Sequence, residues 1–246
     1  MTTIRGARAR ARIEVTAAIK DEARRQLAAE GAAKLSLRAV ARELGMVSSA
    51  LYRYFPSRDE LLTALIVDAY DAVGATAESA IAPPAAPAPT ARWLALCRAV
   101  RAWALAHPHE YALIYGSPVP GYTAPRDTVA PAARVGAALI SIARDAHRSG
   151  GLALPSLAEE IRPEAHRLTA TLAPDLPPAA VVALVAAWSQ LFGLISFEVF
   201  GQFNRLVEDR DAFFDEAVAR LAHETGLGAH PAGALPGSRA GSRSGG

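Results

Sequence analysis

The sequence has only one cysteine, Cys97, among 246 residues, so no disulfide can form within one chain. The six histidines are scattered without metal-ligand spacing, and we expect neither a metal site nor a cofactor. A nucleophile elbow and a glycine-rich phosphate loop are also missing, so the sequence predicts no catalytic residues and no enzyme. No apolar run follows the N-terminal arginines as it would in a signal peptide. We therefore expect a cytoplasmic protein, associated with the nucleoid if it binds DNA.

Excess charge is small but unevenly distributed. The net charge is +2, yet residues 1–60 hold 12 Lys and Arg against 7 Asp and Glu, and the remaining residues hold 14 against 17. A basic N-terminal quarter indicates a polyanionic partner at that end. Arginine far outnumbers lysine, as expected from a GC-rich genome, so codon usage accounts for part of the arginine content.

No segment shows the alternation typical of a β-strand, whereas helical periodicity recurs along the chain. We predict an all-α protein with four parts. A flexible basic arm spans 1–12, and a helix-turn-helix domain with a long connecting helix spans 13–82. A helical effector-binding and dimerisation domain spans 83–225, and a disordered tail spans 226–246. The arm could lie on DNA or could be a solubilising leader. Four prolines in residues 82–89 favour an extended linker between the two domains.

The stretch 36–58 predicts two short helices joined by a tight turn. Ser36 is placed to cap the first helix, and Gly45 to end it with a positive φ. Ser48 can cap the second helix, which Pro56 ends. Helix, turn and helix in this order favour a helix-turn-helix, in which the second helix enters the DNA major groove. An ordinary helical hairpin with a polar outer face is the alternative.

These residues resemble the DNA-binding motif of the tetracycline-repressor (TetR/AcrR) family of bacterial transcription regulators. The resemblance rests on LRAVARELG (37–45), VS (47–48) and LYRYFPSRDELL (51–62), and it covers about residues 10–70. Tyr54 stands where the family most often has histidine, and Arg58 where lysine is common. The resemblance implies an N-terminal three-helix bundle joined by a long helix to a larger helical domain. The expected DNA-binding residues are Ser36, Arg38, Ser48, Ser49, Ala50, Tyr52, Arg53, Tyr54 and Arg58.

Small and hydroxyl-bearing side chains lead the second helix, which suits close approach to a groove about 12 Å wide. We expect Ser48, Ser49, Ala50 and Tyr52 to read bases. Ser36, Arg38, Tyr54 and Arg58 are better placed to hold phosphates.

The segment 179–203 is the most apolar in the chain. Its first nineteen residues carry no charge, which raises the question of a membrane span. Ser189, Gln190 and Ser196 interrupt it, Glu198 lies near its end, and no basic residue flanks its start, so we expect no membrane. We predict a helix that packs against its own core and against a second copy, with monomer core as the alternative. The expected interface residues are Trp188, Leu191, Phe192, Ile195, Val199, Phe213, Phe214 and Leu221.

Aromatic residues of the second domain are candidates for the wall of an effector pocket, because such pockets are mostly apolar. They are Trp93, Trp103, Tyr111, Tyr115, Tyr122 and Trp188, although any one of them could simply be core. Segments 103–111, 116–122 and 188–193 resemble a regulator subgroup whose C-terminal domain is named for a Trp…His-Gly motif. Phe192 replaces the histidine of that motif, which puts any role of the imidazole in doubt.

Together these patterns predict a transcriptional regulator, and specifically a repressor. Its predicted partners are a palindromic double-stranded DNA operator, a small hydrophobic or aromatic effector, and a second copy of itself. The alternative is a membrane-associated or structural helical protein that does not bind DNA.

Overall fold

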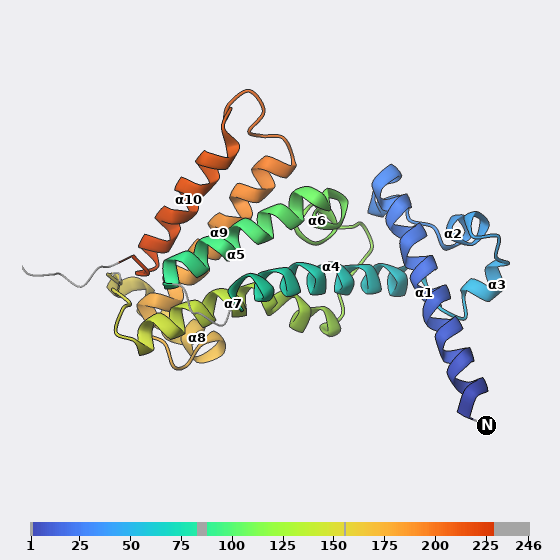
Figure 1. Cartoon of the computed structure of the whole chain (residues 1–246), viewed down its shortest axis with the longest axis horizontal. Helices are drawn as coiled ribbons and strands as arrows, with labels where there is room; N and C mark the ends of the chain where they lie inside the picture. The colour runs from blue at the N-terminus through green and yellow to red at the C-terminus, as the bar shows by residue number, and fades with distance from the viewer. Residues whose placement is uncertain (1, 83–87, 155, 229–246) are drawn as a thin grey trace, which may run out of the picture.

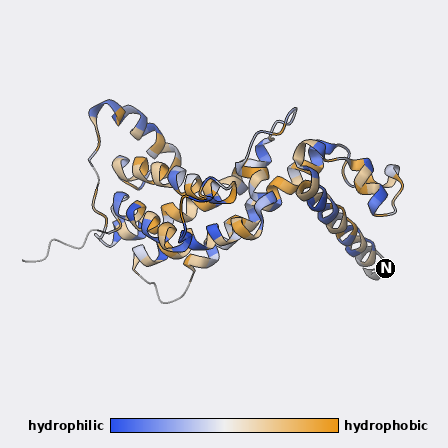
Figure 2. Cartoon of the chain, turned by 90° about the horizontal axis from the view of Figure 1, so that it is seen from above, coloured by the Kyte–Doolittle hydropathy of each residue, from blue (hydrophilic) through white to orange (hydrophobic). Residues whose placement is uncertain are grey.

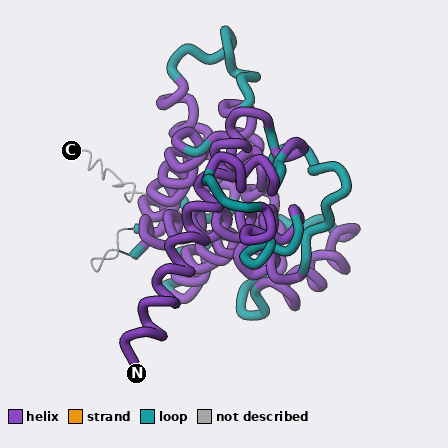
Figure 3. The backbone as a smooth tube through the Cα atoms, turned by 90° about the vertical axis from the view of Figure 1, so that its right-hand side faces the viewer, coloured by secondary structure: helices purple, strands orange, loops and turns teal. Residues whose placement is uncertain are grey.

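The computed structural model describes residues 2–82, 88–154 and 156–228, with side chains from residue 6 onward. Its regular elements are all helices, joined by loops, and the described residues contain no strand, as predicted (Figure 3). The α-helices are α1 Thr2–Glu30, α2 Leu37–Glu43, α3 Ser48–Leu51, α4 Arg58–Ile81, α5 Pro89–Ala106, α6 Pro108–Tyr115, α7 Val129–Arg148, α8 Arg162–Leu172, α9 Pro178–Val199 and α10 Arg210–Glu224. Three short 3-10 helices are η1 Ala32–Lys34, η2 Arg126–Thr128 and η3 Glu159–Ile161.

The N-terminal helices α1, α2 and α3 pack with the start of α4 around a separate apolar core (Figure 1). Apolar residues spaced three and four apart along α2 and α4 supply one buried stripe each. The fully or nearly buried members of this core are Ile19, Ala23, Leu27, Leu35, Leu37, Val40, Ala41, Leu51, Phe55, Leu61, Leu62, Leu65 and Ile66.

Helix α4 belongs to both halves of the molecule. Its first turns contribute Leu61 and Leu65 to the N-terminal core, and its later turns contribute Val73 to the larger core. It packs there against α5 and α7 (Figure 1). At Gly74, an added Cβ would lie 2.7 Å from a side-chain carbon of Arg134, so the absence of a side chain lets α7 come close. One rigid helix therefore connects the two cores.

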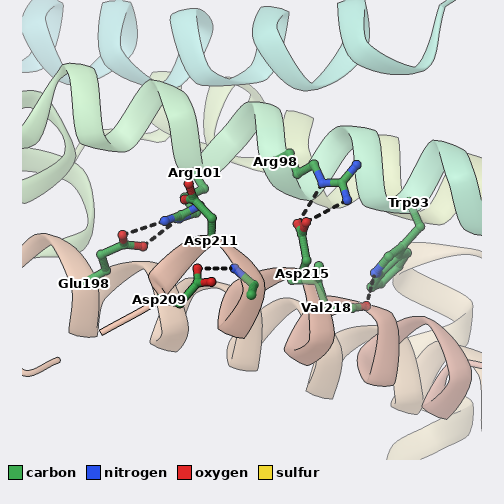
Figure 4. Close-up of polar contacts among 9 residues, drawn as sticks. Trp93, Arg98, Arg101, Glu198, Asp209, Asp211, Asp215 and Val218 are labelled. Carbon is green, nitrogen blue, oxygen red and sulfur yellow. Dashed lines mark hydrogen bonds and ion pairs between the residues drawn. The ribbon is translucent and has the colours of Figure 1, made fainter. Parts of the chain in front are cut away.

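The larger domain comprises α5 to α10, and polar contacts fix α10 onto α5 and α9 (Figure 4). Arg101 on α5 binds Glu198 on α9 through two 2.7 Å hydrogen bonds and also contacts Asp211 on α10. The indole Nε1 of Trp93 donates to the carbonyl of Val218 at 3.0 Å. These side chains are largely buried except for Asp211. The contacts therefore fix the position of α10 relative to α5 and α9.

The structure corrects two predicted terminal segments. The residues expected to form a flexible arm are helical, because α1 begins at Thr2 rather than at Ile13. The predicted tail begins too early, because Gly226 and Leu227 are buried, and the hydroxyl of Thr90 donates to the Leu227 carbonyl at 2.8 Å. The rest of the predicted tail, 229–246, and most of the predicted linker, 83–87, lie outside the described residues.

One further helix end differs from the prediction. Helix α9 ends at Val199 rather than at Phe203, since a turn follows with Gly201 at φ 81°. Pro163 lies in the first turn of α8, where its missing N–H has no helical partner to lose.

Candidate functional site

The turn between α2 and α3 forms as the sequence predicted. The hydroxyl of Ser36 accepts a hydrogen bond from the backbone N–H of Ala39 at 3.4 Å and so caps α2. Gly45 has a φ of 63°, a conformation that costs a residue with a Cβ about 1 kcal/mol or more. Leu51 is fully buried and anchors α3 against the N-terminal core. The two helices are therefore held in the arrangement of a helix-turn-helix.

Helix α3 is shorter than predicted. It ends at Leu51, and Tyr52, Arg53 and Tyr54 follow in a hydrogen-bonded turn instead of continuing the helix. Ser48 and Ser49 are exposed at its start, and the Tyr52 side chain is 41% exposed just beyond its end. The N-cap residue of α3 is Val47, and no side-chain hydrogen bond caps the helix, so Ser48 is not the cap that the sequence predicted. Except for the half-buried Ala50, the residues expected to read bases are free to meet a partner.

Of the residues expected to hold phosphates, Arg38 is exposed and available, whereas the half-buried Ser36 uses its hydroxyl to cap α2. Arg53, expected to contact DNA without a more specific role, is also exposed. Arg58 donates from Nη2 to the carbonyl of Ala32 at 2.9 Å and so connects α4 to η1, a role within the fold that the sequence did not suggest. Tyr54 is half-buried and packs against the N-terminal core.

Arg12 is a residue of this region that the predicted arm did not single out. Its guanidinium lies 5.1 Å from the centroid of the Tyr54 ring, and its Nη2 donates to the carbonyl of Arg53 at 3.5 Å. It helps to line a surface hollow of about 520 Å³ beside α3, together with Val15, Met46, Ala50, Arg53 and Tyr54. The sequence shows the cluster of arginines near the N-terminus. Arg12 lies beside α3 only because this segment is helical.

The six predicted effector-pocket residues do not surround one cavity. Trp93 is buried between α5 and α10, and Trp103 stacks on His107 at 5.3 Å. Tyr122 reaches the DNA-binding half, where its hydroxyl and that of Thr63 are 2.9 Å apart. Trp93, Trp103 and Tyr122 therefore do not line one effector pocket together, contrary to what the sequence predicted. The sequence could not separate core aromatics from pocket aromatics, because both show the same helical spacing.

The other three predicted residues, Tyr111, Tyr115 and Trp188, do gather, and Phe192 joins them. The Tyr115 ring lies 4.1 Å from the Phe192 ring, and the Trp188 ring 5.9 Å from it. The hydroxyl of Tyr111 donates to the Phe192 carbonyl at 3.1 Å and is 2.8 Å from the Ser196 hydroxyl. Burial raises the pKa of Tyr111 to about 12 and raises the pKa of Tyr115 as well, so both phenols stay protonated at neutral pH.

The predicted dimer residues also divide by burial. Leu191, Phe192, Ile195, Phe214 and Leu221 are buried and belong to the apolar core of the larger domain. Burial of the first four leaves almost no side-chain surface for a partner, so the protomer does not support their predicted place at the interface, whereas Leu221 also lines a surface groove between α9 and α10. Trp188 and Phe213 are 38% and 42% exposed and remain candidates, and Val199 is half-buried.

The exposed side of α9 and α10 instead presents residues that the sequence did not select. Phe197 and Phe200 are 53% and 42% exposed. A groove of about 450 Å³ between the two helices is lined by Gln190, Gly193, Leu194, Phe197, Phe203, Phe213, Ala217, Arg220, Leu221 and Glu224. A one-residue error in helix phase, about 100°, is enough to exchange these positions with core positions.

By length and composition, α9 could cross a membrane, and it is the single helix among the described residues that meets this test. In the structure it contacts α5, α7, α8 and α10 within a folded domain. Glu198 near its C-terminal end is buried and paired with Arg101, as in the interior of a globular core.

Comparison with known proteins gives matches over both halves. Residues 19–65 match the family described as "Bacterial regulatory proteins, tetR family", and residues 93–221 match "Tetracyclin repressor-like, C-terminal domain". The chain is 40% identical over 217 residues to the HTH-type transcriptional regulator Rv1816 of Mycobacterium tuberculosis, with 85% of this chain and 92% of that protein covered.

Solved structures share the fold. The crystal structure of SCO4313, described as a regulatory protein, is 38% identical, with a TM-score of 0.73 over 87% of this chain and 98% of that one. RolR, crystallised with the ligand resorcinol, is 16% identical, with a TM-score of 0.51 over 91% and 97% of the two chains. At that identity the likeness to RolR concerns the fold alone. The matched families and the curated relative are transcription regulators, which are not enzymes.

Proposed function

The chain belongs to the tetR family of bacterial regulatory proteins and is a DNA-binding transcriptional regulator, and from that premise we propose that it is a repressor that binds a palindromic operator as a homodimer. A small hydrophobic or aromatic effector releases it from the operator. One observation carries the proposal: α4 has one end in the core beneath the helix-turn-helix and the other in the core of the larger domain. A change in the larger domain can therefore move α3.

Base contacts come from the exposed start of α3 and from the turn after it. Ser48, Ser49 and Tyr52 carry hydroxyls that can bond base edges or phosphates, and they protrude beside the turn. Arg38 and Arg53 supply exposed positive charge for phosphates. Arg58 contributes by holding η1 against α4.

A dimer forms through the outer faces of α9 and α10. The groove between these helices exposes Phe197 and Phe213, and Gly193 leaves room for the approach of another helix. A twofold pairing of this face buries the same aromatics from both copies. Two copies of α3 then lie about one DNA turn, roughly 34 Å, apart on a palindrome.

The effector acts at the aromatic cluster of Tyr111, Tyr115 and Phe192. Tyr111 and Tyr115 belong to α6, which also contacts the DNA-binding half: the hydroxyl of Tyr70 on α4 donates to the carbonyl of Ile114 at 3.3 Å. A ligand that inserts among these rings and prefers a displaced α6 shifts α4 by its difference in affinity for the two states. Aromatic walls favour a hydrophobic or aromatic ligand.

The first experiment measures binding of the wild-type protein and of Tyr52→Ala to the promoter regions of its own gene and the neighbouring genes. Loss of a base contact costs about 1–3 kcal/mol, which weakens binding about 5- to 150-fold. The side chain is exposed, so the dimer mass and the thermal unfolding temperature stay at wild-type values. Tyr52→Phe separates the hydroxyl from the ring.

Three results decide the proposal. Failure of the wild type to bind any of these promoters at low salt refutes the repressor. Binding by Tyr52→Ala at wild-type strength removes Tyr52 from the contact. A thermal-shift screen of aromatic and lipophilic compounds tests the effector, because a ligand at 100 times its Kd stabilises the folded state by about 2.7 kcal/mol. A compound that stabilises the protein without weakening operator binding is not the effector proposed.

A further inference from the structure

The N-terminal part of α1 extends beyond the helical bundle. The helix has 29 residues, yet its first buried residue is Ile19, and residues 6–14 are all exposed. Figure 1 shows this part of α1 continuing past α2 and α3 toward the N-terminus, and Figure 2 shows polar residues along it. Packing within one protomer therefore does not explain why the helix is this long.

Positive charge predominates in this extension. Arg8, Arg10 and Arg12 precede Glu14, the first acidic residue of the chain. Arg8 and Arg12 are four residues apart and share a helix face, where like charges repel and weaken an isolated helix. Within the described part of the chain these three arginines form no ion pair with a carboxylate, whereas Arg24, later on the same helix, binds both Asp21 and Asp68. An anion outside the protomer would relieve the repulsion.

The position of Arg12 shows which way this basic face points. Its contacts with the Arg53 carbonyl and the Tyr54 ring place it next to the turn that follows α3. Arg8 lies one helical turn, about 6 Å, further from the bundle on the same face. The basic face of α1 therefore continues the surface that α3 presents, and Arg53 adds its exposed charge to that surface.

We propose that Arg8 and Arg12, which share the face of α1 beside α3, form a second DNA contact, to phosphates flanking the bases that α3 reads. The proposal rests on the DNA-binding function proposed above. Arginine binds phosphate oxygens through its planar guanidinium, and such contacts carry no sequence information. The extension therefore strengthens binding to all duplexes and lengthens the stretch of DNA that the protein covers.

The test compares wild type with the single variant Arg8→Gln on a mixed-sequence 40-base-pair duplex, so the operator need not be known. Arg12 is left in place because it contacts the helix-turn-helix. Glutamine and arginine have similar helix propensities, and circular dichroism checks that the helix content is kept. Arg167→Gln on α8, whose side chain is 63% exposed at the opposite end of the molecule, is the matched control for loss of positive charge.

The readout is the slope of the logarithm of the association constant against the logarithm of the salt concentration. Each lost phosphate contact lowers the magnitude of that slope by about 0.9, so one contact per protomer lowers it by about 1.8 in a dimer. We expect this change for Arg8→Gln and none for Arg167→Gln. Shortening the duplex should also weaken wild type more than Arg8→Gln.

An Arg8→Gln variant that keeps both the wild-type slope and the wild-type dependence on duplex length overturns this inference and leaves the DNA-binding function standing. Wild-type protein that binds neither this duplex nor its promoters refutes the DNA-binding function itself. A slope lowered equally by Arg167→Gln shows a general effect of net charge and also refutes the contact.

Discussion

Replacing Phe197 by glutamate tests the dimer face that the structure exposes. Phe197 is 53% exposed on α9 and lines the groove with Phe213 and Gly193. Within its own protomer its ring contacts Phe203 at a centroid distance of 5.6 Å, and about half of the side chain is exposed. The substitution should therefore leave the protomer folded and prevent a second copy from covering the groove, because burying a carboxylate among the aromatic side chains of the groove costs free energy.

The size of the effect follows from the exposed area. A phenylalanine side chain buries about 150–250 Å², so about 100 Å² of Phe197 remains to be covered by a partner. At about 25 cal/mol per Å² this is about 2.5 kcal/mol for each protomer and about 5 kcal/mol for a symmetric pair. Ordering costs reduce this sum, but even half of it raises the dimer dissociation constant by roughly 60-fold, since 1.4 kcal/mol is a factor of ten.

Sedimentation velocity over a range of concentrations measures this change directly. Wild type should sediment as a dimer, Phe197→Glu as a monomer at the same concentration, and Phe197→Leu close to wild type. Operator affinity should fall with the loss of the dimer. A dimeric mass for Phe197→Glu across the concentration range refutes the assignment of this face.

Gly193→Arg is a second test of the same face, which keeps the prediction testable if Phe197→Glu unfolds the protein. A Cβ at Gly193 meets no atom within 4 Å, and replacing a glycine within a helix adds about 0.5–1 kcal/mol of stability. This variant should unfold no more easily than an isolated wild-type protomer, yet be monomeric because its charge blocks the groove. Dimers of both variants together would place the interface elsewhere.

Two further predictions concern the contacts between α5, α9 and α10. Arg101→Met leaves Glu198 buried and unpaired, so it should lower the free energy of unfolding by about 3–5 kcal/mol in urea titrations. The double variant Arg101→Met/Glu198→Met should regain most of this loss. Equal stability of Arg101→Met and wild type would contradict this prediction. The hydrogen bonds from Arg98 hold the pKa of Asp215 below its ordinary value, so its stabilising contribution is present above about pH 4 and is lost as pH falls through its folded-state pKa. The thermal unfolding temperature of wild type should therefore be level from pH 8 to pH 5 and fall below pH 4. This fall should be less steep in Asp215→Asn. Identical acid profiles for wild type and Asp215→Asn would show that the pair of Arg98 and Asp215 does not contribute to stability.

Local chemistry made much of this protein predictable from its sequence. The cap at Ser36, the positive φ at Gly45 and the buried Leu51 depend on residues a few positions apart, and the motif around them specified the family. The long helix α4 and the all-α class followed from helical periodicity. These features need no knowledge of distant contacts.

Tertiary structure decided which face of each helix is used. Leu191 and Phe197 are both apolar residues of α9, and only packing against α5, α6, α7 and α10 shows that the first belongs to the core and the second to the surface. The substitution Leu191→Glu would bury a charge in that core and unfold the domain, so it does not test dimerisation.

The sequence by itself determined the DNA-binding motif, the helical class and the basic N-terminal end, because spacing and charge are properties of the chain. Only the fold decided that the arginines near the N-terminus lie on a helix beside α3, that Arg58 holds η1, and that Tyr111 and Tyr115 meet Phe192. These are contacts between residues 26 to 81 positions apart, and Arg12 reaches Arg53 across 41 positions. Contacts at such separations depend on how whole helices pack, and helix packing is set by the sum of many weak apolar contacts rather than by any local pattern.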